Sequence, residues 1–245
     1  MDGVVWQGLK PIGDLPAIFD RIHKRGWKVL LATNNSTRTP NQYVERLAGY
    51  GVSVDSWQVV NSVDVTAHYM LKHYPVGSSV YVIGEEGIST ALVENGFNID
   101  DKNVIAVVAG MDRQVTYDKL RQATLLIRSG APFIGTNPDR TFPTPEGLVP
   151  GAGSILVALE AATSVKPLIM GKPSPAIYQL ALERLGTSPA ETLVVGDRLE
   201  TDIAGAQAIG CRTAVVLSGV CTQADALAWQ PPPDIIVEDL TSLVK

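Results

Sequence analysis

Four short polar clusters in this 245-residue sequence combine side chains that could hold a phosphate group beside a metal ion. Together they supply a hydroxyl, an amide, an ammonium and carboxylates. The clusters are Asp2 with Gly3, Thr33 with Asn34, Lys172, and Asp197 with Asp202. Carboxylate oxygens are hard ligands of the kind that magnesium prefers, and magnesium is commonly shared with a substrate phosphate. An ammonium and a hydroxyl can donate hydrogen bonds to phosphate oxygens. The residue types therefore predict a phosphate site beside a divalent cation.

Three of the clusters stand at the ends of short apolar runs that are typical of buried strands. The runs are 27–32, 167–171 and 192–195. Asp2 and Gly3 have the residue types of a loop that leaves a strand, although no strand stands before them in the sequence. In an open parallel α/β sheet the carboxyl ends of the strands converge on one crevice, where ligands bind. We therefore expect the clusters to meet in space, with Asp197 on a loop and Asp202 at the start of the next helix.

Segments with helical periodicity alternate with these runs. The first, 14–26, has Asp14 as a candidate N-cap, Pro16 in its first turn and Gly26 at its end. Further helices are expected at 40–47, 59–74 (with Ser62 as cap), 89–95, 117–129, 154–163, 176–185 and 203–209. Further strands are expected at 79–83, 104–109, 132–136, 213–217 and 235–237, and a polar loop at 137–145. The alternation of strand, loop and helix predicts an α/β fold with a doubly wound parallel sheet.

Turn residues at 75–79 separate two such series, which indicates a domain boundary. We interpret 1–77 and 167–245 as a doubly wound, Rossmann-like core. Residues 78–166 then form an inserted α/β domain of about 90 residues, a size that a small domain can have. Within the insertion, Asp139 and Arg140 could either contact a substrate or form an exposed ion pair.

Composition excludes several classes of function. The net charge of −5 leaves no basic footprint, so a nucleic-acid partner is not expected. No apolar run approaches the roughly 20 residues of a membrane-spanning helix, and the first residues lack the order of a signal peptide. Cys211 and Cys221 have no CxxC spacing, which favours free thiols in a reducing compartment and hence a cytoplasmic location. No GxxxxGK[ST] segment occurs, so a P-loop nucleotidase is not expected.

The segments MDGVVWQG, LLATNNSTRT, GKPSP and VVGDRLETDI resemble, in order and spacing, the motifs of the haloacid dehalogenase superfamily of aspartate-dependent phosphatases. The chain is most similar to the subgroup of nitrophenyl-phosphatase and sugar- or glycolate-phosphate phosphatases. In that subgroup a large α/β cap is inserted between the second and third motifs, where the insertion falls here. The segments GTNPDRTFPT and PGAGSI also resemble the cap of this subgroup. The resemblance covers nearly the whole chain.

The resemblance implies a phosphoaspartyl mechanism with Mg²⁺ as cofactor. In that mechanism a first aspartate attacks phosphorus, and a second, two residues later, protonates the leaving oxygen and then activates water. Asp2 matches the second aspartate, and its backbone carbonyl matches a metal ligand. Thr33 and Asn34 match the phosphate-binding second motif and Lys172 the third. In the fourth motif, Asp197 matches a metal ligand and Asp202 an acidic residue that supports the metal site through water.

One position departs from the family pattern. The nucleophile of the family stands two residues before the position of Asp2, immediately before Met1, so it is outside the 245 residues. A late start assignment, a shortened chain and true degeneration would each explain this. We favour the first, because the other three motifs are intact. A polypeptide of these 245 residues is expected to be inactive or nearly so.

The leading hypothesis is therefore a magnesium-dependent phosphomonoesterase for small phosphorylated metabolites, because a large cap closes the site to larger substrates. The alternative is a degenerate protein that binds or senses phosphorylated metabolites without turnover. Dehalogenase or phosphomutase chemistry is less favoured by the cap position and the magnesium-type fourth motif. The resemblance also favours a homodimer through the cap.

Overall fold

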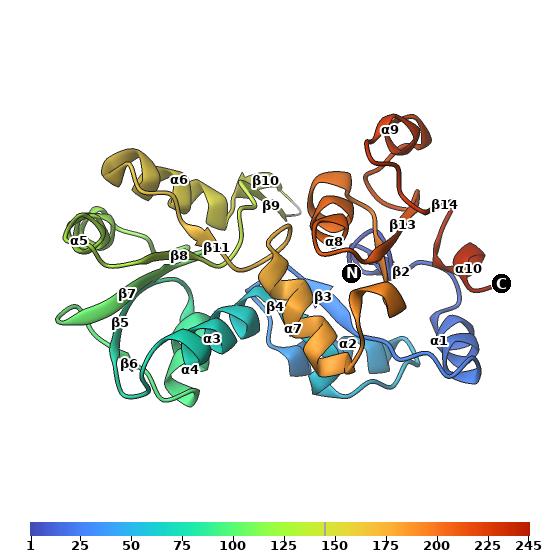
Figure 1. The fold of residues 1–245 in the computed structure, drawn as a ribbon, viewed down its shortest axis with the longest axis horizontal. Helices are drawn as coiled ribbons and strands as arrows, with labels where there is room; N and C mark the ends of the chain where they lie inside the picture. Colours follow the sequence, from blue (N-terminus) through green and yellow to red (C-terminus); the bar gives the residue numbers. More distant parts are fainter. Residues whose placement is uncertain (145) are drawn as a thin grey trace. The chain divides into compact units, whose positions relative to one another are not determined.

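The computed structural model describes residues 1–144 and 146–245, which form two compact units (Figure 1). The first unit comprises 1–32, 40–60 and 172–245, and the second comprises 33–39 and 61–171. The sequence-based boundaries, at 77/78 and 166/167, fall inside the second unit. The assignment of a core domain and a cap domain stays a prediction, and each unit is described by itself below.

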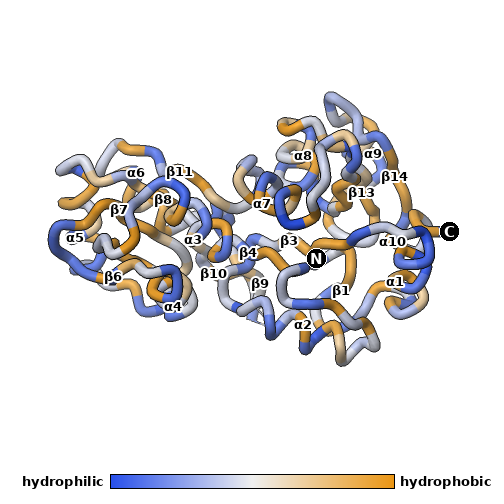
Figure 2. The backbone as a smooth tube through the Cα atoms, turned by 60° about the horizontal axis from the view of Figure 1, so that its bottom comes forward, coloured by the Kyte–Doolittle hydropathy of each residue, from blue (hydrophilic) through white to orange (hydrophobic). Residues whose placement is uncertain are grey.

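A five-stranded parallel sheet forms the centre of the second unit, with the order β11-β8-β7-β5-β6. Its strands are β5 (Ser79–Ile83), β6 (Asn98–Ile99), β7 (Val104–Ala109), β8 (Phe133–Gly135) and β11 (Leu168–Ile169). None of them contains a charged residue, and β7 and β8 have hydrophobic colouring in Figure 2. Strands of this composition are expected where both faces of a parallel sheet are covered.

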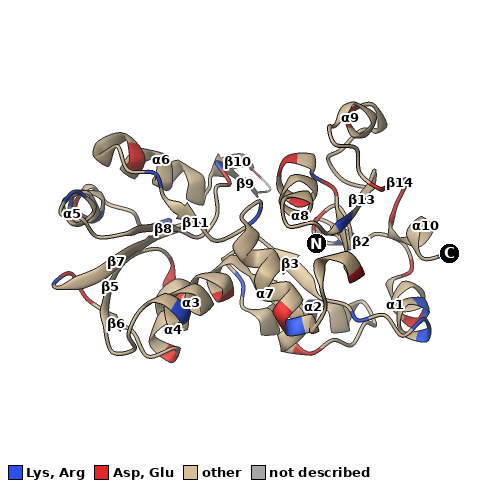
Figure 3. Ribbon diagram, in the orientation of Figure 1, with Lys and Arg blue, Asp and Glu red and all other residues tan. Residues whose placement is uncertain are grey.

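Helices cover the two faces of this sheet. They are α3 (Ser62–His73) and α4 (Glu86–Glu94) on one face, and α5 (Tyr117–Arg128) and α6 (Ala152–Thr163) on the other (Figure 1). A hairpin of β9 (Thr141–Thr144) and β10 (Gly147–Pro150) precedes α6. The charged side chains of this unit lie on its helices and loops rather than on the sheet (Figure 3). The doubly wound α/β class predicted from the sequence is confirmed.

The first unit contains a parallel sheet of three strands and several helices. Its strands are β12 (Leu193–Gly196), β13 (Arg212–Val216) and β14 (Ile235–Val237), in that order across the sheet. The pair β3 (Leu31–Thr33) and β4 (Val59–Asn61) begins in this unit. Its helices and turns are α1 (Leu15–Lys24), α2 (Pro40–Gly49), η1 (Ser56–Gln58), α7 (Pro175–Leu185), η2 (Pro189–Glu191), the π-helical turn η3 (Leu199–Ile203), α8 (Ala204–Ala208), α9 (Gln223–Ala228) and α10 (Leu240–Leu243).

The amino-terminal hairpin, β1 (Trp6–Gln7) with β2 (Lys10–Pro11), is anchored by an aromatic cluster. Trp6 is fully buried, and its ring stacks on Tyr43 at 6.3 Å between centroids. The guanidinium of Arg46 lies 4.0 Å from the centroid of Trp6, a cation–π contact. Because Trp6 is fixed in this way, the preceding loop with Asp2 has a defined place in the first unit.

Several local predictions hold and others need correction. Asp14 caps α1 by accepting from Ala17 N at 3.1 Å, and the apolar stripe of that helix is buried. The helix expected at 59–74 begins only at Ser62, because 59–61 form β4 and Asn61, not Ser62, is the cap. Part of the predicted loop 137–145 forms β9, and Pro145 lies outside the described residues.

The strand expected at 167–171 is the shorter β11. It pairs with β8 of the second unit, so it does not belong to the sheet of the first unit as predicted. Apolar runs predict strands well but do not say which neighbour a strand pairs with. Among the described residues, no helix is long and apolar enough to span a membrane.

Asn61 is the cap that joins α3 to the segment before it. Its Oδ1 accepts from the backbone N–H groups of Val63 (2.8 Å) and Asp64 (2.9 Å), and its Nδ2 donates to Arg38 O at 3.1 Å. We expect Asn61→Ala to lower the free energy of unfolding by about 2 kcal/mol, because buried caps are at the upper end of the usual range. Thr116→Ala, which removes the exposed cap of α5, should cost about half as much. Urea denaturation measures both free energies of unfolding, and equal losses in Asn61→Ala and Thr116→Ala would contradict the special role of Asn61.

Candidate functional site

Asp197 follows the last residue of β12, at the carboxyl end of the sheet, as the sequence predicts. Its side chain is 6% exposed and Oδ2 accepts from Val220 N at 3.1 Å. The carboxylate lies so close to Gly3 and Gly219 that a Cβ added at either glycine would overlap it. Two glycines therefore allow the main chain to close around this carboxylate.

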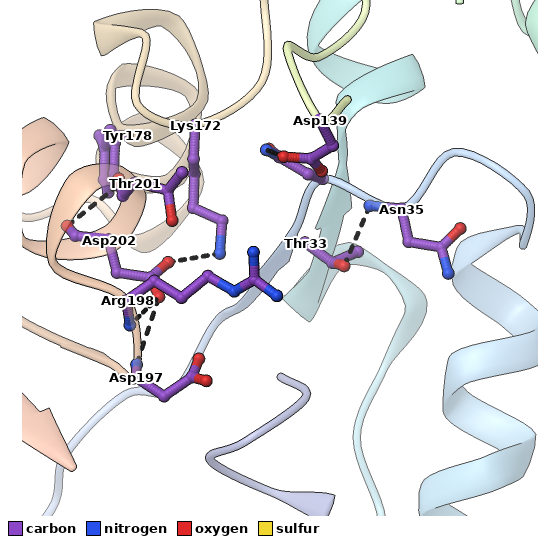
Figure 4. Close-up of polar contacts among 10 residues, drawn as sticks. Thr33, Asn35, Asp139, Lys172, Tyr178, Asp197, Arg198, Thr201 and Asp202 are labelled. Carbon is purple, nitrogen blue, oxygen red and sulfur yellow. Dashed lines mark hydrogen bonds and ion pairs between the residues drawn. The ribbon is translucent and has the colours of Figure 1, made fainter. Parts of the chain in front are cut away.

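Asp202 lies in the π-helical turn after β12 and is also buried. Its Oδ1 accepts from Lys172 Nζ at 2.6 Å, and its Oδ2 accepts from the backbone N–H groups of Asp197 (3.3 Å) and Arg198 (3.2 Å) (Figure 4). Both carboxylate oxygens are thus engaged by the protein. The Lys172–Asp202 ion pair is sheltered, with side chains 14% and 7% exposed.

The two carboxylates differ in their affinity for protons. Burial raises the pKa of Asp197, and the nearby charge of Asp202 raises it further. Burial would also raise the pKa of Asp202, but the ammonium of Lys172 and the hydrogen bonds to the ionised form lower it overall. Among the described ion pairs, the ammonium of Lys172 pairs with Asp202. Asp197 is a buried carboxylate whose pKa stays raised, although the charges of the amino terminus and Arg198 oppose that rise.

Asp2 itself is exposed, at the start of the loop before β1. The next residue, Gly3, has φ of +70°, contacts the Asp197 carboxylate, and accepts a hydrogen bond on its carbonyl from Ser218 Oγ at 2.7 Å. Burial lowers the pKa of the Met1 amino group, the charge of Lys172 lowers it further, and the charges of Asp202, Asp2 and Asp197 oppose this. The structure therefore brings four predicted site residues together in the first unit.

Thr33 and Asn34 are the other two predicted site residues, and they belong to the second unit. Both are buried, at 7% and 8% exposure. Thr33 Oγ1 accepts from Asn35 N at 3.2 Å (Figure 4). Asn34 Nδ2 donates to Asp139 Oδ1 at 3.4 Å, so Asp139 contacts a predicted site residue.

The donor set near Asp197 fits a magnesium ion that also binds substrate. No group of three or more His, Cys, Asp or Glu side chains suited to a metal occurs within residues 1–144 and 146–245. Magnesium seldom needs such a cage, because it uses one or two carboxylates together with water and phosphate. Asp197 supplies a buried carboxylate without the ammonium that Asp202 has, so a bound cation would offset its charge. Asp202 fits an indirect role better, because the protein already engages both its oxygens.

Sequence reasoning missed Tyr178, which supports the site from α7. Its hydroxyl lies 2.6 Å from Thr201 O and 3.1 Å from Asp202 O, and thus holds the turn that carries Asp202 (Figure 4). Burial and then the charge of Asp202 raise the pKa of Tyr178, so it stays a neutral donor. A tyrosine six residues after Lys172 has no sequence signal of its own. Asp139, which contacts Asn34, could have been found from the sequence, because the segment GTNPDRTFPT resembles the cap of the family subgroup.

Comparison with known proteins gives concordant matches over the chain. Residues 1–98 match the family described as haloacid dehalogenase-like hydrolase, and residues 169–243 match a HAD-hydrolase-like family. An acid sugar phosphatase of Staphylococcus aureus (strain USA300) is 40% identical over 245 residues, which are all of this chain and 94% of that protein.

Two solved structures are similar across both units. A p-nitrophenyl phosphatase from Archaeoglobus fulgidus is 32% identical, with a TM-score of 0.92 over 99% of this chain and 95% of that one. A glycerol phosphate phosphatase from Mycobacterium tuberculosis in complex with magnesium is 34% identical, with a TM-score of 0.91 over 99% of this chain and 74% of that one.

Removal of the ammonium should destabilise the protein in a pH-dependent way. We expect Lys172→Met to lower the free energy of unfolding by about 3 kcal/mol at neutral pH, because it leaves Asp202 as an unpaired buried charge. With Lys172, the lowered pKa of Asp202 gives stability that is present above the ordinary aspartate range and lost as the pH falls through the lowered value. Without Lys172, burial raises that pKa, so Asp202 accepts a proton and the penalty shrinks in acid.

Denaturation curves at several pH values test this, with Lys24→Met as the control because it breaks the exposed pair with Asp20. That control should change stability little at any pH. A penalty for Lys172→Met that does not diminish toward acid pH would contradict the role given to Asp202.

Proposed function

Because the chain belongs to the haloacid dehalogenase-like hydrolases, in the subgroup of nitrophenyl- and sugar-phosphate phosphatases, we propose that it hydrolyses small phosphorylated metabolites through a phosphoaspartyl intermediate with magnesium. That it is a phosphoric monoester hydrolase follows from its family. The observation that carries the finer proposal is the buried Asp197 carboxylate, closed in by Gly3 and Gly219 beside the Lys172–Asp202 ion pair.

The substrate class is proposed from the relatives. Their names specify sugar phosphate, p-nitrophenyl phosphate and glycerol phosphate, which share a phosphate monoester on a small leaving group. Small sugar phosphates, phosphoglycolate-like compounds and nitrophenyl phosphate are therefore the first candidates. The inserted cap, the homodimer through it and the cytoplasmic location stay predictions.

Each site residue has a proposed task. Asp2, which is exposed, is the acid that protonates the leaving oxygen and the base that activates water. Lys172 offers its ammonium to the phosphate oxygens, and the bond to Asp202 holds that ammonium in place. Thr33 and Asn34 are the further phosphate ligands. Asp197 and the Asp2 carbonyl would hold the magnesium ion, with Asp202 acting indirectly, and a bound ion would offset charge on the phosphate.

The position of the nucleophile also has support from the first unit. In a longer chain the preceding residue would be attached to the Met1 nitrogen, and the pKa of that nitrogen as a free amino group is shifted by burial and by the charges of Lys172, Asp202, Asp2 and Asp197. A carboxylate there would stand beside the ammonium and the metal ligands, where attack on a bound phosphate is required. This place agrees with the one that the family resemblance implies for the nucleophile, two positions before Asp2.

Turnover should depend on that upstream aspartate. We expect a polypeptide of these 245 residues to release no phosphate from a metabolite panel, whereas one extended by a short apolar strand ending in aspartate at this position should be active. The matched control carries asparagine at the added position and should be inactive although equally stable. In the extended chain Asp2→Asn should lower kcat by about 100-fold or more, as expected for loss of a general acid–base group.

The extended chain is also expected to melt at a higher temperature, because an added central strand buries more apolar surface. Tight binding of phosphorylated metabolites without turnover by the extended chain would favour the alternative of a binding or regulatory protein. Full activity of the 245-residue polypeptide would contradict the assignment of the nucleophile.

Metal binding and stability should change in opposite directions at Asp197. We expect Asp197→Asn to weaken magnesium binding at least 10-fold in a calorimetric titration with inorganic phosphate present, because it removes the anionic ligand. With a chelator present to remove metal, the same variant should have a higher melting temperature than the unsubstituted chain at neutral pH. The raised pKa of Asp197 shows that its ionised form costs stability above the ordinary aspartate range, and asparagine removes that cost.

Asp225→Asn is a matched control, because Asp225 is an exposed aspartate of the same unit at the start of α9. It should leave magnesium affinity unchanged. Magnesium binding by Asp197→Asn as tight as that of the unsubstituted chain would exclude Asp197 as the ligand.

A further inference from the structure

Two buried side chains of the second unit converge on a single backbone carbonyl. Ser62 Oγ donates to Asn34 O at 2.8 Å, and Asn137 Nδ2 donates to the same oxygen at 3.0 Å. Ser62 is 0% exposed and Asn137 is 4% exposed. They come from distant elements, since Ser62 begins α3 and Asn137 follows β8. A carbonyl oxygen has two lone pairs, so this pair of donors satisfies it fully.

The orientation of the Asn137 amide is itself fixed. Its Oδ1 accepts from Asp139 N at 3.2 Å, which leaves Nδ2 to donate to Asn34 O. Asp139 Oδ1 in turn accepts from the side chain of Asn34 at 3.4 Å. A Cβ at Gly171 would come within 2.6 Å of Asn34 Oδ1, so the chain also packs closely on the other end of that amide. The segment 137–139 thus holds Asn34 at two places, the main-chain carbonyl and the side-chain amide of Asn34.

The carbonyl of Asn34 shares a peptide plane with the N–H of Asn35. Because the peptide group is planar, fixing the carbonyl also fixes the direction of that N–H. The N–H of Asn35 donates to Thr33 Oγ1 at 3.2 Å. A hydroxyl has one hydrogen and two lone pairs, so a Thr33 hydroxyl that accepts this bond keeps its own hydrogen for another acceptor.

We propose that Ser62 and Asn137 are positioning residues that act through the Asn34–Asn35 peptide to keep the Thr33 hydroxyl hydrogen available for a phosphate oxygen. This inference rests on the proposed function, in which Thr33 binds phosphate. It adds two residues, one from the start of α3 and one from the loop after β8. Asn137 lies in the segment GTNPDRTFPT, which resembles the cap of the family, but that resemblance implies no role for either residue. Buried donors are costly unless they find an acceptor, and here both donate to the Asn34 carbonyl in this peptide orientation.

The test is a set of double-mutant cycles read out as affinity for inorganic phosphate. The 245-residue chain with magnesium is used, because phosphate binding requires no turnover. Ser62→Ala and Asn137→Ala are each made with Thr33 unchanged and with Thr33→Val, which removes the hydroxyl while keeping the shape. The matched control is Thr163→Val, which deletes a buried hydroxyl that donates to Leu159 O at 2.7 Å elsewhere in the same unit.

With Thr33 present, each of the two alanine variants should bind phosphate about fivefold more weakly, as expected for one lost hydrogen bond. With Thr33→Val, which should itself weaken binding about tenfold or more, the same changes should have less than a twofold effect. Ser62→Thr, which keeps a hydroxyl, should restore most of the affinity. Thr163→Val should leave phosphate affinity unchanged in either background.

A second measurement keeps the inference testable where Thr33→Val binds phosphate too weakly to titrate. Amide hydrogen exchange should be faster at Asn35 in Ser62→Ala and Asn137→Ala, and unchanged in Thr163→Val. Equal losses of affinity with and without the Thr33 hydroxyl, or unaltered exchange at Asn35, would overturn the inference alone. Absence of phosphate binding by the unsubstituted chain would instead overturn the proposed function and the inference with it.

Discussion

The chemistry of the first unit depends on one buried ion pair, between Lys172 and Asp202. Two aspartates of the same loop and turn are buried there, but only Asp202 receives the ammonium and two backbone N–H groups. Its pKa is lowered as a result, whereas that of Asp197 is raised. Because the ammonium of Lys172 pairs with Asp202, Asp197 is the buried carboxylate whose negative charge a bound cation could offset. The same pair also fixes the position of the Lys172 ammonium, which is proposed to bind phosphate.

An analogous constraint operates in the second unit, where no charge is needed. The peptide between Asn34 and Asn35 is held at its carbonyl by Ser62 and Asn137 and at its N–H by Thr33. Backbone groups inside a protein must find partners, so the surrounding side chains select one orientation of this peptide. In each unit, the groups beside the proposed ligand-binding side chains are thus already satisfied within the protein. Such preorganisation favours binding because little rearrangement is left to the moment of contact.

Agreement between sequence and structure is best where a single periodic pattern decides the outcome. The strands Ser79–Ile83 and Val104–Ala109 have the predicted limits, and Asp14 caps its helix. Errors arise where two patterns compete. The apolar residues before Ser62 continue a helical pattern, yet the pairing of β4 with β3 and the strong cap at Asn61 delay the helix. The partner of β11 could not be predicted either, because pairing depends on distant residues.

The sequence by itself determined the types, order and spacing of the site residues, and with them the family and the class of chemistry. Local spacing suffices for this, since strand ends and helix starts follow from short-range patterns. Only the tertiary structure decided which carboxylate receives the ammonium, and which side chains hold the Asn34 carbonyl. Asn137 lies 103 residues from Asn34, and Lys172 lies 30 from Asp202. Packing and the need to satisfy buried polar groups determine such partners. Local sequence patterns do not contain that information, because the partners are far apart in the chain.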